Sequence, residues 1–81
     1  MTEEKRVHLS GMYAGQSGRV VRIDGGMGLV SRLSAMDIRP GRKITKLSSM
    51  LMRGPVTVQA GSTRLAIGFG MASRIIVELE Q

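Results

Sequence analysis

Short alternating runs of apolar and polar residues dominate this chain, and they predict strands rather than long helices. From Ser17 to Ile23, the apolar residues Val21 and Ile23 flank Arg22, which is typical of a strand with one solvated face. Similar patterns predict further strands over Lys43–Ser49, Pro55–Ala60, Thr63–Gly68 and Ile75–Leu79. Because glycines and short turns separate these runs, we expect an antiparallel meander.

One segment has helical periodicity instead. Leu29, Leu33 and Met36 recur at helical spacing, which places them on one face of about two helical turns. Ser31 and Arg32 then lie on the solvated side. We expect this helix to cap one side of the core and to leave Arg32 exposed as a candidate partner contact.

Turn-forming residues follow the predicted helix. Asp37 stands where the helix must end, and Asp is one of the few residues besides glycine that tolerate the left-handed conformation common there. Pro40 and Gly41 complete the exit turn. Further along the chain, Ala72 and Ser73 predict a single helical turn before the closing strand.

The length and glycine content of the chain fit a small barrel. A domain of 81 residues buries only somewhat more than about 60% of its unfolded surface, so its core is modest. Eleven glycines supply the corners of strongly bent strands. We therefore predict a mainly β fold: a small, partly open barrel of the SH3-like or OB type, with about five antiparallel strands, one short helix and a single helical turn. Residues 7–81 form this domain, and residues 1–6 form a flexible N-terminus.

The chain is basic, with twelve Lys and Arg residues against six Asp and Glu residues and a net charge of +6. Such a balance favours polyanionic partners. Recognition of single-stranded nucleic acid depends on aromatic stacking, however, and the only aromatic residues are Tyr13 and Phe69. The cations are also spread over the predicted outer faces of strands and turns, at Arg19, Arg22, Arg32, Arg39, Arg42, Lys43, Lys46, Arg53, Arg64 and Arg74. Nucleic acid is therefore the weaker interpretation.

Few side chains could carry chemistry: one histidine, six carboxylates and no cysteine. A catalytic site needs converging groups, and we predict neither an enzyme nor a cofactor. A zinc or iron site needs about three or four ligands, whereas His8 has only Glu3 and Glu4 close in sequence. We predict no metal site and interpret His8 as a surface or edge residue, with a weak site near it left open.

Hydropathy indicates where the protein resides. No apolar run approaches the roughly 18 to 20 residues that cross a bilayer, and the start of the chain lacks the apolar region of a signal peptide. The absence of cysteine is compatible with a reducing compartment. We predict a cytoplasmic protein with at most peripheral membrane association.

Two features suggest contacts between proteins. Met50, Leu51, Met52 and Arg53 fall at a predicted hairpin tip, where polar turn residues are usual. This tip either folds back over an open end of the barrel or offers a partner an apolar patch. The second feature is the predicted edge strand at residues 76–80, which a homodimer could extend.

The order of the motifs resembles the FeoA family, small cytoplasmic SH3-like proteins associated with the bacterial ferrous iron transporter FeoB. The resemblance spans residues 9–78 and rests on Gly15-x-x-Gly18-Arg19-Val20, Gly25-Gly26, Arg32-Leu33, Met36-Asp37-Ile38-x-Pro40-Gly41, Gly54-Pro55-Val56-x-Val58, Leu65-Ala66-Ile67 and Ala72-x-x-Ile75-x-Val77. Asp37 departs from the pattern, because the family usually has glycine there. We expect the same turn at a small conformational cost.

This resemblance implies a non-enzymatic accessory or regulatory protein of ferrous iron uptake that docks on the cytosolic part of FeoB. Arg32 and the tip at residues 50–53 are the candidate contacts. Two alternatives stay open: a small basic barrel that binds nucleic acid, and a metal-sensing domain related to those of DtxR-type repressors.

Overall fold

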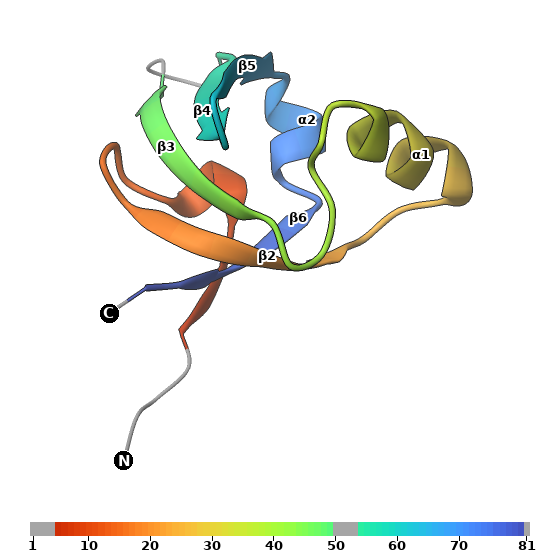
Figure 1. The fold of residues 1–81 in the computed structure, drawn as a ribbon, viewed down its shortest axis with the longest axis horizontal. Coiled ribbons are helices and arrows are strands. Elements are labelled where there is room, and N and C mark those ends of the chain that lie inside the picture. The colour runs from red at the N-terminus through yellow and green to blue at the C-terminus, as the bar shows by residue number, and fades with distance from the viewer. Residues whose placement is uncertain (1–4, 50–53, 81) are drawn as a thin grey trace.

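The computed structural model describes residues 5–49 and 54–80. In chain order its elements are β1 (Arg6–His8), the 3-10 helix η1 (Leu9–Gly11), β2 (Ser17–Ile23), α1 (Met27–Ala35), β3 (Lys43–Ser49), β4 (Val56–Ala60), β5 (Thr63–Ile67), α2 (Phe69–Ala72) and β6 (Ile75–Leu79). Figure 1 shows a curved sheet with α1 at one end of the long axis. The predicted strand bounds are confirmed to within a residue, and the single helical turn before the last strand is α2.

The strands form one antiparallel sheet in the order β1-β6-β2-β3-β4-β5. Register shifts interrupt the pairing at Val20/Arg22 and at Lys46/Ser48. Such bulges bend a strand and increase its twist, and Figure 1 shows the resulting curl. In the described part of the chain no pairing joins β1 to β5, so the sheet stays open between them. The predicted mainly β, partly open barrel is confirmed.

Strands β2 and β6 approach each other closely at Gly18. A Cβ atom at this position would lie 2.5 Å from the carbonyl oxygen of Glu78 and 2.5 Å from Cγ1 of Val77. Because a side chain would force the two strands apart, only glycine fits here.

The predicted position of the sheet edge was wrong. Strand β1 pairs with β6 in the register Arg6↔Glu78 and His8↔Ile76, and β2 pairs with the other side of β6. Residues 76–79 therefore lie inside the sheet, and the dimer expected from this edge has no free strand to extend. Strand β1 was not predicted, and Arg6 was expected in a flexible terminus, because a strand of 3 residues is too short to show periodicity.

The core lies between the curved sheet and the helical segments. Its buried side chains come from every strand of β2 to β6 and from η1, α1 and α2: Leu9, Met12, Val20, Ile23, Leu33, Ile38, Ile44, Val56, Val58, Ala60, Ile67, Ala72, Ile75 and Val77. The alternating pattern that predicted β6 does not describe its burial fully, because Ile75, Ile76 and Val77 are all buried. A strand with neighbours on both sides exposes less surface than an edge strand.

Lys46 was predicted on the solvated outer face, and this was wrong. Its side chain is 1% exposed, and among the described residues it is the only polar side chain that is buried. The period of two along β3 explains its direction, because Lys46 lies on the same side as Ile44. Its Nζ donates to the carbonyl oxygens of Leu9 and Ser10 at 3.3 Å each, and to that of Met12.

Replacing Lys46 with methionine should lower the free energy of unfolding by about 2 kcal/mol or more. The substitution removes the Lys46 donor from the carbonyl oxygens of Leu9, Ser10 and Met12, of which Leu9 O still accepts from Met12 N–H at 3.1 Å. An unsatisfied buried acceptor costs about 1–3 kcal/mol. Urea denaturation followed by circular dichroism measures the loss. Lys43→Met, on the exposed side of the same strand, is the matched control and should stay within about 0.5 kcal/mol of the wild type. A Lys46→Met variant as stable as the wild type would contradict this prediction.

Lys46 should also make the free energy of unfolding depend on pH. Burial lowers the pKa of Lys46 below its ordinary value. Between the folded and unfolded pKa values the unfolded chain binds more protons, so the stability of the native state rises with pH in this window. We expect the difference in unfolding free energy between the wild type and Lys46→Met to grow as the pH is raised from neutral to about 10.4. A difference independent of pH would contradict the lowered pKa.

Candidate functional site: exposed surfaces on α1 and on the turn after it

Helix α1 attaches to the core through one apolar face, as its periodicity predicts. Leu33 is fully buried, while Leu29, Val30 and Met36 are partly buried against the core. The nine residues of α1 begin after Gly26, which supplies no side-chain cap. Tertiary packing of this face, rather than helix propensity, therefore holds so short a helix in place.

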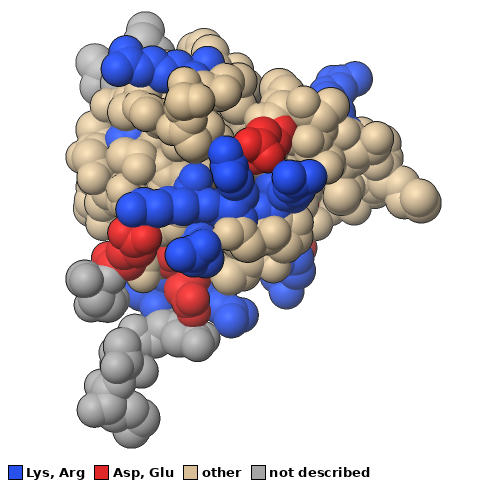
Figure 2. Space-filling view, viewed as in Figure 1, with Lys and Arg blue, Asp and Glu red and all other residues tan. Residues whose placement is uncertain are grey.

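The other side of α1 is an exposed, weakly polar surface. A hollow of about 480 Å³ runs along it, lined by Gly25, Met27, Val30, Ser31, Ser34 and Ala35, which we call the α1 outer face. Met27 is 89% exposed, and Figure 2 shows this end of the molecule as mainly uncharged. A flexible methionine beside small side chains is suited to an adaptable apolar contact.

Arg32 is exposed in the last turn of α1, as the sequence predicted. A cation at this end of a helix interacts favourably with the helix dipole. Its role as a partner contact stays a prediction. The other predicted contacts, Met50, Leu51, Met52 and Arg53, lie outside the described residues.

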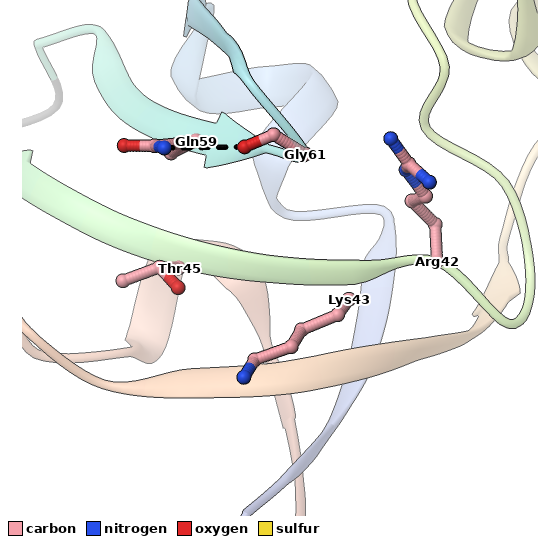
Figure 3. A pocket seen from close by; sticks show the side chains of 5 residues that line it. All are labelled: Arg42, Lys43, Thr45, Gln59 and Gly61. Atoms are coloured by element: carbon pink, nitrogen blue, oxygen red, sulfur yellow. Dashed lines mark hydrogen bonds between the residues drawn. The ribbon is translucent and has the colours of Figure 1, made fainter.

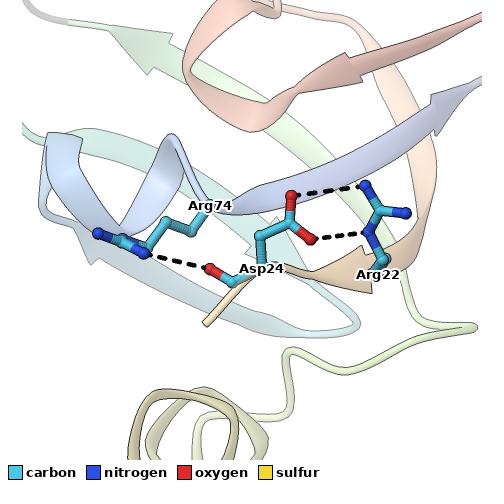
Figure 4. A network of polar contacts seen from close by, with 3 residues as sticks. All are labelled: Arg22, Asp24 and Arg74. Atoms are coloured by element: carbon cyan, nitrogen blue, oxygen red, sulfur yellow. Dashed lines mark hydrogen bonds and ion pairs between the residues drawn. The ribbon is translucent and has the colours of Figure 1, made fainter. Parts of the chain in front are cut away.

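A polar clasp at Asp24 fixes the segment that leads into α1 (Figure 4). The Asp24 N–H donates to the carbonyl oxygen of Arg74 at 2.7 Å, and Arg74 Nη1 donates to the carbonyl oxygen of Asp24 at 3.5 Å. Nε of Arg22 donates to Asp24 Oδ1 at 2.7 Å. These contacts join the end of β2 to the turn before β6, so the N-terminal side of α1 has a defined starting point.

The end of α1 is closed by backbone hydrogen bonds around Asp37. Asp37 has φ = 67°, and it is the only described residue other than glycine with a positive φ. The N–H of Asp37 donates to Ser34 O at 2.9 Å, and the N–H of Ile38 donates to Leu33 O at 2.9 Å. This pair of bonds is the Schellman motif. The predicted left-handed Asp37 is thus confirmed.

The carboxylate of Asp37 organises the basic turn, which we define as Arg39, Arg42 and Lys43. Its Oδ2 lies 2.6 Å from Nη2 of Arg42, and its Oδ1 lies 3.4 Å from Nη2 of Arg39. Lys43 Nζ lies 3.5 Å from Glu80 Oε2. The cations of the basic turn therefore already face carboxylates. Figure 2 shows basic side chains in a band across this face of the molecule, with acidic side chains beside them.

A groove of about 290 Å³ borders the basic turn, lined by Arg42, Lys43, Thr45, Gln59 and Gly61. Figure 3 shows Arg42 pointing toward Gly61, whereas Lys43 extends toward β2. The guanidinium occupies the space that a Cβ atom at Gly61 would need. The side chains of Arg42 and Lys43 point in different directions, so they do not surround one small anion. They could instead form ion pairs with separate carboxylates on a protein surface.

The described part of the chain contains no cluster of potential metal ligands. Among residues 5–49 and 54–80, no three His, Asp or Glu side chains come together as metal ligands. His8 is exposed in β1, an edge strand, as predicted for a surface or edge residue. The burial of Lys46 was not predicted, although the alternation along β3 places its side chain on the inner side of the sheet.

An open antiparallel sheet with short helices and exposed contact surfaces defines a small domain of the SH3-like class. Comparison with known proteins identifies the family: residues 7–79 match the model of the FeoA domain. The chain belongs to the FeoA family, which is associated with ferrous iron transport. Neither helix of the described residues has the length and apolar character of a membrane span.

Individual relatives agree with this assignment. A candidate Fe(2+) transport protein A of Methanocaldococcus jannaschii is 36% identical over 64 residues, covering 79% of this chain and 76% of its own. The crystal structure of an iron uptake regulatory protein, FeoA, is 39% identical with a TM-score of 0.89, covering 94% of this chain and 100% of its own. A manganese-dependent transcriptional repressor has a TM-score of 0.86 at 18% identity, covering 99% of this chain and 45% of its own, and this likeness concerns the fold.

Substitutions at Asp37 should separate backbone strain from charge. Asp37→Ala and Asp37→Gly both remove the ion pairs with Arg39 and Arg42, but only glycine adopts the left-handed conformation without strain. We expect the glycine variant to be more stable than the alanine variant by about 1 kcal/mol, measured by thermal or urea unfolding. Equal stability of the two variants would show that the turn changes its conformation when the carboxylate is lost.

Proposed function

We propose that this protein is a non-enzymatic accessory or regulatory component of ferrous iron uptake. It acts in the cytoplasm by binding the cytosolic part of a FeoB-type transporter. The observation that carries the proposal is the FeoA match over residues 7–79, supported by 39% identity to an iron uptake regulatory protein over nearly the whole chain. An accessory role needs a stable surface and no reaction centre.

The α1 outer face supports binding of a protein rather than of nucleic acid. Met27 and its small neighbours offer apolar area, and the exposed Arg32 on the same helix adds a charge that can bind a carboxylate. The net charge of +6 favours approach to an acidic partner surface or to a membrane with anionic lipids. Arg32 and Met27 are therefore the contacts that we test first.

Calorimetric titration of the full chain with the cytosolic part of its own transporter tests this proposal. We expect binding at moderate salt and a loss of about tenfold or more in Arg32→Glu and Met27→Glu. Met27→Glu should still fold, because its side chain is exposed and a carboxylate is favourable in the first turn of a helix.

Arg64→Glu is the matched control, because it makes the same charge change on the exposed side of β5. It separates a specific contact from general electrostatic attraction. The absence of detectable wild-type binding, together with unchanged iron uptake on gene deletion, would overturn the proposed function. Equal losses in Arg32→Glu and Arg64→Glu would overturn the choice of α1 as the contact.

A further inference from the structure

A buried ammonium is an unusual choice at the position of Lys46. Its cross-strand partner in β4 is Val58, and the preceding inward residue of β3 is Ile44, both fully buried. An apolar side chain would fill this place without desolvating a charge. Natural sequences break such local rules mainly where a function requires it. The contacts of Lys46 therefore indicate its functional role.

Both the side chain and the backbone of Lys46 hold one segment, residues 9–16. The Nζ atom donates to the carbonyl oxygens of Leu9, Ser10 and Met12. The backbone oxygen of Lys46 accepts from Gly15 N–H at 2.7 Å, and its N–H donates to Gln16 O at 2.9 Å. Hydrogen bonds of Lys46 therefore hold residues 9–12 on one side of Tyr13 and residues 15 and 16 on the other.

Tyr13 begins a turn that is closed within this segment. Gln16 N–H donates to Tyr13 O at 3.0 Å, and Tyr13 N–H donates to Gln16 Oε1 at 2.7 Å. Gly15 supplies the required positive φ of 93°. The Tyr13 side chain is 77% exposed, so an ordered backbone presents an aromatic ring to solvent.

We propose that residues 9–16 are a preformed contact loop whose Tyr13 inserts into a pocket on the protein partner. The partner is the one named in the proposed function, on which this inference rests. A tyrosine on an ordered loop offers a large amphipathic contact at a low cost in conformational entropy, and tyrosine is enriched among residues that carry binding energy. Lys46 is the positioning residue of this loop, and Tyr13 makes the contact.

A protein partner fits this loop better than nucleic acid. Single strands are bound by successive stacking platforms, and the sequence contains only one other aromatic residue, Phe69 of α2. One ring can fill one pocket but cannot stack a row of bases. The hydroxyl group of Tyr13 needs an acceptor in that pocket, so Tyr13→Phe should bind more weakly than the wild type and more tightly than Tyr13→Ala.

The experiment compares binding of the wild type, Tyr13→Ala, Tyr13→Phe and Lys46→Met to the cytosolic part of the transporter by calorimetry. We expect Tyr13→Ala to lose about tenfold or more in affinity and to keep its melting temperature, because the side chain is exposed. Arg64→Ala, another exposed position, is the control and should bind like the wild type.

Because Tyr13 is the only tyrosine, labelling with 3-fluorotyrosine gives a single ¹⁹F resonance from the proposed contact. This resonance should shift when the transporter fragment is added and should not shift with an oligothymidylate. In Lys46→Met we expect a narrower resonance from a more mobile loop, and weaker binding at a temperature where the variant is folded. Loosening of the loop, unlike a general loss of stability, is visible in this linewidth.

The outcomes separate the two proposals. Wild-type binding with Tyr13→Ala within about twofold of it would overturn the contact loop and leave the proposed function standing. Failure of the wild type to bind would overturn both. A resonance that responds only to the oligothymidylate would assign the loop to nucleic acid and overturn its role as a protein contact.

Discussion

The ammonium of Lys46 connects the sheet to the segment that covers its inner side. Three carbonyl oxygens of residues 9–12 accept from this one donor group. Of these, Leu9 O also accepts from the N–H of Met12 at 3.1 Å. The core of so small a domain cannot absorb the loss of many such hydrogen bonds. The hydrogen bonds of Lys46 place η1 against the inner side of the sheet. They also hold the turn from which Tyr13 is exposed.

Helix α1 depends on two kinds of contact: one apolar face packs on the core, and local polar contacts fix where the helix begins and ends. The Asp24 clasp sets its start, and the Schellman motif at Asp37 sets its end. Between them Leu33 is the only residue of the helix that is fully buried. A helix with defined ends and one face packed on the core can leave its outer face to a partner without weakening the sheet. Free energies of local opening should therefore be lower in α1 than in β6.

Much of this fold could be predicted from local patterns. The predicted bounds of β2, β3 and β6 match the strands of the structure, and Asp37 followed by Pro40 and Gly41 marks the end of α1. Strand β1 could not be found this way, because its 3 residues show no period and their pairing depends on β6. Lys46 was misplaced because charge was given more weight than the period of β3. On the outer side of α1 the sequence predicted the exposure of Ser31 and Arg32 but not that of Met27, which depends on how α1 sits on the core.

The position of β6 also bears on how the chain assembles. The last strand in sequence lies between β1 and β2, which come first. During synthesis, β1 and β2 exist long before the strand that joins them, and each has an open edge until β6 is available. Closing the sheet brings together residues from opposite ends of the sequence, with the loop-closure entropy that this entails. The part of the sheet beside β1 can therefore be completed only when β6 is available, and a newly made chain is exposed to pairing with other chains until this strand is inserted.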